Sequence, residues 1–263
     1  MNRQKRTHLI ILFIATLFAS QASAQEIKTT EKPISNKILN FQFHYTYAFT
    51  GGELAQRFGP IHNIGFGGLL KTTHNWLIGI DGSYQFGSNV DENISSRILS
   101  NISNSSGAVS NNAGNSSVLS IGERGLNFFV KGGKVIPIFL TSNLNSGIVI
   151  MAGGGFVSHM VNISTSANVP TLTDDLKRGY DRLTMGWAAN QFVGYYFQGK
   201  NRFINFYVGV DVIEAFTKSV RGYNYDERAF DNASRTDVFY GPRFGWMIPI
   251  YLNTKEQEEF FYK

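Results

Sequence analysis

The chain has 263 residues but contains no cysteine and only 6 prolines. The absence of cysteine excludes disulfide bonds, thiolate metal sites, a thiol nucleophile and a lipid anchor carried by a cysteine. Beyond residue 24 the sequence also lacks any uninterrupted apolar run of about 18 residues, which is the length that a membrane-spanning helix requires. If this part of the chain enters a bilayer, it must therefore do so with β-strands.

The N-terminus has the layout of a secretory signal. Basic Arg3, Lys5 and Arg6 precede an apolar run over 9–19, and a motif of small residues ends at Ala24. The apolar run is too short to span a bilayer as a helix. We therefore expect residues 1–24 to be a signal peptide that is cleaved after Ala24, so that the rest of the chain is exported.

The exported part of the chain has only a small positive net charge. The chain has 24 basic and 19 acidic residues, and removing the three basic residues of the signal leaves 21 basic residues against 19 acidic ones. No dense block of lysine and arginine remains that would neutralise a row of phosphates. We therefore expect no nucleic-acid partner.

Glycine and aromatic residues are abundant, with 27 Gly, 22 Phe and 12 Tyr. In the segment 41–49 every odd position is aromatic and every even position is polar or small. A period of two predicts a β-strand with one apolar face. Seven further segments show the same period with more exceptions. The eight predicted strands are 41–49, 61–70, 76–86, 123–138, 148–161, 183–197, 203–214 and 238–251.

The connections between the predicted strands alternate between long and short. Short turns at 71–75, 141–146 and 198–202 separate longer connections, of which 87–122 is rich in Asn and Ser. This alternation is typical of outer-membrane barrels, which have short periplasmic turns and long external loops. Pro242 lies inside the last predicted strand and predicts a bulge or a lost ladder bond there.

The volumes of the two strand faces indicate which face is outside. The interior of an eight-stranded barrel is only just wide enough for side chains, so its inner face should carry small residues. Here one face is rich in Gly, Ala, Ser and Asn, and the other carries most of the Phe, Tyr, Ile and Val and all 3 Trp. Only lipid tolerates such an aromatic outer face. The sequence thus predicts an all-β fold, a closed antiparallel up-and-down transmembrane β-barrel of about eight strands, with two aromatic girdles.

This pattern covers 41–251 and resembles the small outer-membrane barrels of Gram-negative bacteria with OmpA/OmpX-like architecture. The segment 245–251, a glycine followed by spaced apolar residues, resembles their terminal assembly signal, although 252–263 follow it. The Asn-rich, aromatic style looks like that of Bacteroidota barrels, some of which serve type IX secretion and gliding machinery. The resemblance implies a protein of the cell outer membrane. Its parts would be a periplasmic N-terminal segment 25–38, a barrel 39–251 with long extracellular loops, and a periplasmic C-terminal tail.

The strand faces place six ionisable residues in the barrel interior. They are His44, Asp81, Glu123, Lys131, Asp211 and Arg243. One interpretation is a binding or proton site, and the other is a lattice of paired charges that fills a barrel too narrow for water flow. We expect the lattice, and we expect no cofactor, no metal site and no open diffusion pore.

An enzyme is one alternative, because lipid-modifying hydrolases and acyltransferases combine a His with a Ser on such a scaffold. Ser158 and His159 are the only adjacent Ser/His pair, and Asp174 and Asp175 follow in the next loop. A nucleophile needs its base within hydrogen-bond reach, but neighbours on a strand point to opposite faces. We therefore expect no catalytic residues.

Two segments have the composition of a contact surface. The segment 222–230 mixes aromatic and charged residues, and the tail contains three consecutive aromatic residues after an acidic run. The candidate partner-binding residues are Tyr223, Tyr225, Arg228, Phe230, Phe260, Phe261 and Tyr262.

We expect a non-enzymatic integral outer-membrane barrel that acts through its surface loops and periplasmic tail. Its role would be that of an interaction protein or a subunit of an envelope complex, including type IX secretion or gliding machinery. Its partners would be outer-membrane lipid and other envelope proteins. A small-solute channel and a lipid-modifying enzyme are the alternatives.

Overall fold

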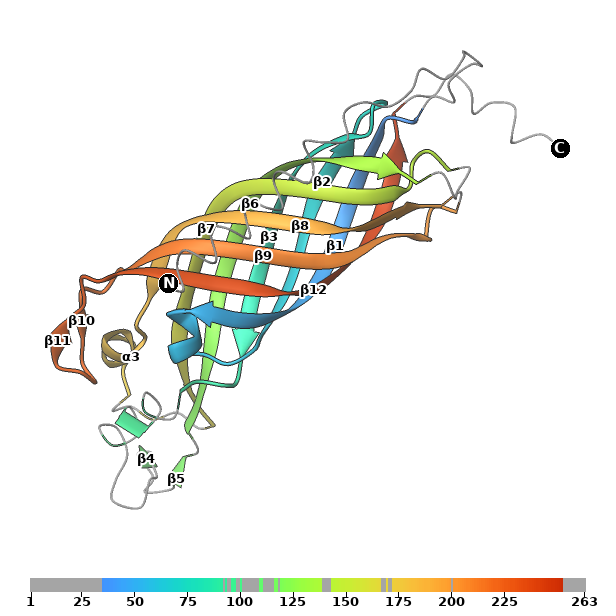
Figure 1. Ribbon diagram of the computed structural model, residues 1–263. Coiled ribbons are helices and arrows are strands. Elements are labelled where there is room, and N and C mark those ends of the chain that lie inside the picture. The colour runs from blue at the N-terminus through green and yellow to red at the C-terminus, as the bar shows by residue number, and fades with distance from the viewer. Residues whose placement is uncertain are drawn as a thin grey trace, which may run out of the picture. The chain divides into compact units, whose positions relative to one another are not determined.

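The structure is a computed structural model that describes residues 35–91, 93, 96–97, 100, 109–110, 116–117, 119–138, 143–166, 169, 172–199 and 201–252. Its eight long strands are β1 (Ile38–Gly52), β2 (Ile61–Lys71), β3 (Trp76–Gly87), β6 (Leu119–Pro137), β7 (Gly147–Thr165), β8 (Thr184–Gln198), β9 (Asn205–Ser219) and β12 (Ser234–Tyr251). They form a closed barrel in the order β1, β12, β9, β8, β7, β6, β3 and β2, and all neighbouring pairs are antiparallel (Figure 1). The predicted fold class is confirmed. The signal peptide and the tail from residue 253 onward lie outside the described residues.

Shorter elements occur in the long connections. They are the 3₁₀ helix η1 (Leu54–Gln56), the helix α3 (Asp174–Tyr180), and two small hairpins formed by β4 (Val109–Ser110) with β5 (Ser116–Ser117) and by β10 (Tyr223–Asn224) with β11 (Ala229–Phe230). Helix α3 begins after Thr173, whose side chain accepts a hydrogen bond from the backbone N–H of Leu176, the usual role of a threonine N-cap. No helix in the described part of the chain combines the length and the hydropathy needed to cross a bilayer.

Side chains alternate strictly between the lumen and the outer wall. In β1 every even position from Ile38 to Ala48 is buried, whereas Phe41, Phe43 and Tyr45 are 41–53% exposed. The large apolar side chains on the outer wall would be unfavourable in water over so wide a band. The wall is therefore that of a membrane-spanning barrel, with the aromatic face outward as the side-chain volumes predict.

Pro242 interrupts the ladder between β12 and β1 without shifting it. Thr46 pairs with Arg243 and Phe49 pairs with Tyr240, but the two pairs between them are missing. The register is the same on both sides of this gap, so no residue is inserted. Of the two outcomes expected at Pro242, the structure contains the lost ladder bond and not the bulge, because a proline has no N–H to donate.

Most of the longer connections lie at one end of the barrel. The connections 53–60, 88–118, 166–183 and 220–233, which we call the long connections, share this end, although 53–60 is one residue shorter than the connection 138–146 at the other end. At the opposite end lie the short turns, the start of β1 and the end of β12 (Figure 1). This is the arrangement of outer-membrane barrels, in which the long loops are external.

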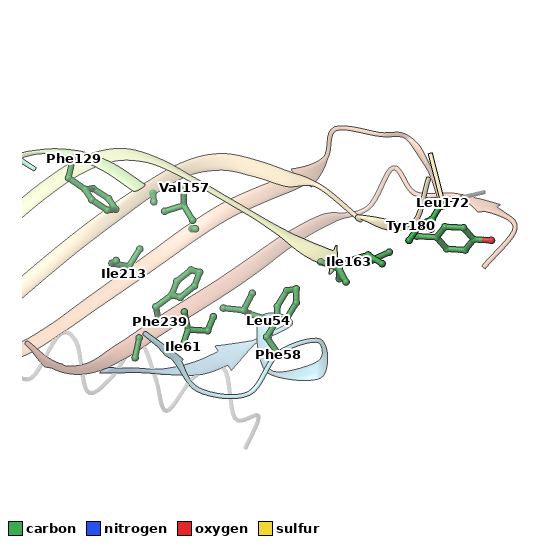
Figure 2. Close-up of a cluster of buried hydrophobic side chains, with 14 of the residues drawn as sticks. Leu54, Phe58, Ile61, Phe129, Val157, Ile163, Leu172, Tyr180, Ile213 and Phe239 are labelled. Carbon is green, nitrogen blue, oxygen red and sulfur yellow. The ribbon is translucent and has the colours of Figure 1, made fainter. Parts of the chain in front are cut away.

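Apolar side chains form two separate clusters inside the barrel. The cluster toward the long connections includes Leu54 and Phe58, which lie against Ile61 and Phe239 (Figure 2). The cluster toward the short turns includes Phe192 and Met247. Since Leu54 and Phe58 belong to the connection between β1 and β2, that connection folds over the lumen and closes it with apolar contacts.

Candidate functional site

All six ionisable residues predicted for the interior are buried, with at most 5% of each residue exposed. They come from β1, β3, β6, β9 and β12, so they line the lumen from most sides. Their inward direction follows from the period of two along each strand. The structure joins only four of them into one cluster.

The central cluster consists of two acids and two bases. Lys131 Nζ lies 2.7 Å from Asp81 Oδ2, and Arg243 Nη1 lies 3.3 Å from Asp211 Oδ2. Arg243 Nη2 also pairs with Asp81, which joins β12 to β3 across the lumen. Asn190 donates to Asp211 Oδ1 at 3.0 Å. Each charge therefore has an opposite charge beside it, as buried charges require.

Within the described part of the chain, the other two predicted residues form no hydrogen bond or ion pair with this cluster, although His44 faces the charges of Arg243, Asp81 and Lys131. The ring of His44 lies so close to Gly65 that a Cβ there would be 2.5 Å from it. Glu123 is fully buried, and neither of its carboxylate oxygens has a hydrogen-bond partner among the described residues. The expectation that all six form one lattice of paired charges is therefore wrong for these two residues.

A second buried network surrounds Asp237 and was not predicted. Its carboxylate accepts hydrogen bonds from Thr217 Oγ1 at 2.5 Å and from Arg57 Nη2 at 2.9 Å. His159 Nε2 lies 2.9 Å from the same carboxylate. The predicted strand began at residue 238, and continuing its inward phase by one residue would have placed Asp237 in the lumen. Arg57 lies in a connection, where no period could have indicated it.

The Ser158–His159 pair is split between the two faces of β7. Ser158 is half-buried on the outer side and donates to the backbone oxygen of Leu126 at 3.3 Å. His159 is fully buried in the lumen beside Asp237. Asp174 and Asp175 are solvent-exposed and pair with bases on α3. The two residues therefore cannot act as nucleophile and base for each other.

Ion pairs connect three of the long connections to one another, and we name these ion pairs the loop clasp. Its residues are Arg97, Asp181, Arg182, Arg221, Asp226 and Glu227. Arg182 pairs with Asp226 and with Glu227, the latter at 2.9 Å. Arg221 Nη2 lies 2.5 Å from Asp181 Oδ2. Single exposed pairs contribute little, but several shared charges fix these loops relative to one another.

The base of the last long connection is held by Asp231. Both of its carboxylate oxygens lie 2.6 Å from Arg235 Nη2, and Asn224 donates to it at 3.2 Å. Burial alone would raise the pKa of Asp231, but the bonds from Arg235 outweigh it and hold the pKa below the ordinary value of 3.8. The carboxylate is therefore charged at neutral pH.

The four candidate residues of the 222–230 segment gather on one small hairpin, residues 223–230, which we name the aromatic hairpin. The ring centroid of Tyr223 lies 5.1 Å from that of Phe230 and 6.0 Å from that of Tyr225. Arg228 occupies the turn with a positive φ of 51°. Phe230 is 80% exposed and Tyr225 is 44% exposed.

The aromatic hairpin is attached to α3. The backbone N–H of Tyr225 donates to the oxygen of Gly179 at 3.0 Å, and the Tyr225 ring lies 5.7 Å from the ring of Tyr180. A Cβ at Gly179 would come within 2.1 Å of the Tyr225 ring, so this close approach depends on glycine. Phe260, Phe261 and Tyr262 lie outside the described residues.

A polar hollow of about 420 Å³ opens beside the loop clasp. Each of the four long connections contributes a lining residue, among them Glu53, Asp91, Arg182 and Glu227. Charges of both signs therefore face the hollow. In the described part of the chain no group of three or more His, Cys, Asp or Glu side chains could hold a metal ion.

No protein-family model and no curated protein matches the chain. Among solved structures it is similar to the attachment invasion locus protein Ail of Yersinia pestis, with 4% identity and a TM-score of 0.37 over 82% of this chain and 100% of that one. It is also similar to the N-terminal β-barrel domain of Pseudomonas aeruginosa OprF, with 10% identity and a TM-score of 0.36 over 82% of this chain and 99% of that one. For the outer membrane protein OprG of Pseudomonas aeruginosa the identity is 11% and the TM-score 0.34, over 82% and 97%. At these values the matches do not bear on ligand or partner, and the fold rests on the ring of strands itself.

Proposed function

We propose that the protein is a non-enzymatic outer-membrane barrel that binds a protein partner outside the cell through the aromatic hairpin. The observation that carries this proposal is the exposure of Phe230 and Tyr225 on a hairpin that the structure otherwise fixes in place. Tyrosine and arginine are enriched among the residues that dominate binding energy. Exposed aromatic side chains that lie together on an ordered hairpin are typical of a surface that a partner covers.

The loop clasp supports the same proposal. Ion pairs to Arg182 and the contact with α3 hold the hairpin in one arrangement before any partner arrives. A pre-ordered surface loses less conformational entropy on binding than a free loop does. The clasp therefore favours affinity without adding a contact to the partner.

The interior argues against the channel and the enzyme. Two apolar clusters and the charge cluster between them fill successive layers of the lumen. His159 and Thr217 both bond to Asp237 rather than to each other, beneath the apolar cover of Leu54 and Phe58. These hydrogen bonds link neighbouring parts of the barrel wall. Neither His159 nor Thr217 is exposed as a base or a nucleophile.

The test is a crosslinked pull-down from outer membranes, with an affinity tag inserted in the connection 88–118 and whole-cell labelling to establish that the tag is external. We expect the wild type to capture a partner, and the variants Phe230→Ser and Tyr225→Ser to lose it. The matched control is Phe203→Ser, because Phe203 is 70% exposed but lies in a short turn at the opposite end. Equal capture by all of these variants would contradict the proposal.

The same experiment addresses the envelope-complex role and the periplasmic tail. A captured periplasmic protein that survives Phe230→Ser but not removal of residues 253–263 would move the contact to the tail. The type IX secretion role and the likeness to Bacteroidota barrels remain predictions from the sequence.

A further inference from the structure

One region of the outer wall has small side chains where most of the wall has large ones. Over β1, β2, β3 and β6 most of the lipid-facing side chains near mid-height are large and apolar. They include Phe43, Ile64, Phe66, Ile78, Ile80, Leu126 and Phe128. Over β7 and β8 the corresponding exposed positions are Ala152, Gly154 and Ala189. The register places Gly154 directly opposite Ala189, so the small residues form one flat area.

Two polar side chains stand in this flat area. Gln191 is the central residue of β8, faces outward and is exposed. Glu214 of β9 also faces outward, directly opposite Ala189, and the next outward pair is Gln191 with Val212. Neither Gln191 nor Glu214 has a hydrogen bond or an ion pair within the described residues. Phe216 and Trp187 lie nearer to the long connections than Gln191 and Glu214 do. The two polar residues therefore lie within the hydrocarbon-facing band.

This placement is unfavourable for a barrel that is surrounded only by lipid. Hydrocarbon offers no hydrogen-bond partner to an amide or a carboxyl group, and polar substitutions on the lipid face cost most near mid-depth. In membranes, small residues that allow close approach, together with polar residues that bond across the contact, are the marks of protein–protein packing. The polar pair therefore requires a protein on this side of the barrel.

We propose that this wall over β7, β8 and β9 packs against a second copy of the chain. The patch carries both a donor, the Gln191 amide, and an acceptor, the Glu214 carboxyl oxygens, which makes it complementary to itself. In a two-fold contact, Gln191 of one protomer donates to Glu214 of the partner subunit, and the same bond forms a second time by symmetry. The small side chains let the two walls come close enough for both bonds.

The test uses the absence of cysteine from the chain, since any introduced thiol is then unique. Ala189→Cys places a thiol between the two polar residues, two positions above the centre of β8. The matched control is Ile64→Cys, two positions above the centre of β2, which lies diametrically opposite β8 in the ring. On oxidation of isolated outer membranes we expect Ala189→Cys to form a disulfide-linked dimer and Ile64→Cys to remain monomeric.

A second pair of variants tests whether the dimer depends on the hydrogen bonds between Gln191 and Glu214 or only on the closeness of the two walls. In the Ala189→Cys background, Gln191→Leu with Glu214→Leu should reduce the dimer to the level of Ile64→Cys, because both bonds are lost. The exchange Gln191→Glu with Glu214→Gln should restore the dimer, since it keeps one donor and one acceptor. The heat-dependent shift in gel mobility verifies that each variant is a folded barrel.

The remaining outcomes overturn the proposal. Equal crosslinking of the two cysteine variants would mean random collision in the membrane. If the folded Ala189→Cys variant stays monomeric, this part of the outer wall contacts only lipid. A crosslinked product with a mass other than twice that of the chain would identify a different protein as the occupant.

Discussion

At the scale of single residues, the interior is stabilised by charges that reach across the lumen. Arg243 touches Asp81 and Asp211, and Lys131 touches Asp81. Removing one partner of a buried pair leaves an uncompensated charge, which costs more than the pair contributes. These residues are therefore the most sensitive polar positions of the barrel.

Replacing Arg243 with Met should destabilise the barrel by about 3–5 kcal/mol, because Asp81 and Asp211 would lose a shared cation. The free energy of unfolding in urea, measured from lipid vesicles, provides the readout. The control is Arg178→Met, whose exposed pair with Asp175 should contribute less than about 1 kcal/mol. Similar losses in both variants would refute the structural role of the cluster.

Two adjacent glycines of β2 offer a second residue-scale prediction. A Cβ at Gly67 would lie 2.3 Å from the Ile80 oxygen and 2.8 Å from Asp81 Cβ, whereas one at Gly68 would meet nothing within 4 Å. We expect Gly67→Ala to cost about 1–3 kcal/mol through overpacking. Gly68→Ala should be neutral or stabilising by up to about 1 kcal/mol, because alanine loses less backbone freedom. The free energy of unfolding in urea measures both effects. An equal loss of stability in the two variants would count against the inward direction of Gly67.

At the scale of elements, the described parts of two long connections are held together by specific contacts. The aromatic hairpin is joined to α3 through Tyr225 and to its own base through Asp231. Its order depends on the ionised carboxylate of Asp231, so it should depend on pH. The binding role that we propose for the hairpin therefore rests on both its packing and its electrostatics.

Acid should loosen the aromatic hairpin before it affects the barrel. The pKa of Asp231 is lowered by Arg235 below the ordinary value of 3.8. The pair therefore contributes its full stability above that value, and the contribution is lost as pH falls through the lower folded pKa. Hydrogen-exchange protection of residues 223–230 should drop in acid while that of β8 is unchanged. Asp231→Asn should show the acid behaviour at neutral pH, and unchanged protection in this variant would disprove the role of the pair.

The sequence predicted the strands well because apolar and polar residues alternate along them, without exception from Phe41 to Phe49. The expectation of small inward residues holds only in part, since large side chains such as Phe192, Tyr207 and Phe239 are also buried in the interior. The contacts of Arg57 and of the loop clasp could not be predicted, since they join residues such as Arg182 and Glu227 that have no shared period. Glu123 was placed correctly in the lumen, but its lack of a partner depends on geometry that periodicity does not encode.

At the scale of the whole molecule, the barrel is closed in layers. The long-connection end is covered by Leu54 and Phe58, the centre is held by charges, and a second apolar cluster follows toward the short turns. An eight-stranded ring leaves room for little more than these side chains. We therefore expect the barrel to separate the two sides of the membrane and not to form a channel between them.

Purified barrel added to a planar lipid bilayer should accordingly produce no stable single-channel conductance. An established porin in the same chamber serves as the positive control for insertion. A steady conductance that is abolished by Leu54→Trp would contradict the layered interior and revive the channel alternative.

The gap in the ladder at Pro242 lies at a special place in the ring. It belongs to the seam between β1 and β12, the first and last strands of the barrel to leave the ribosome. The ring cannot close until both of these strands are present, so this seam can form only after the last strand has been made. A proline there leaves the seam with fewer bonds to form and to break than a full ladder would have. The seam that closes the ring is thus held by two separate runs of paired residues, one on each side of Pro242.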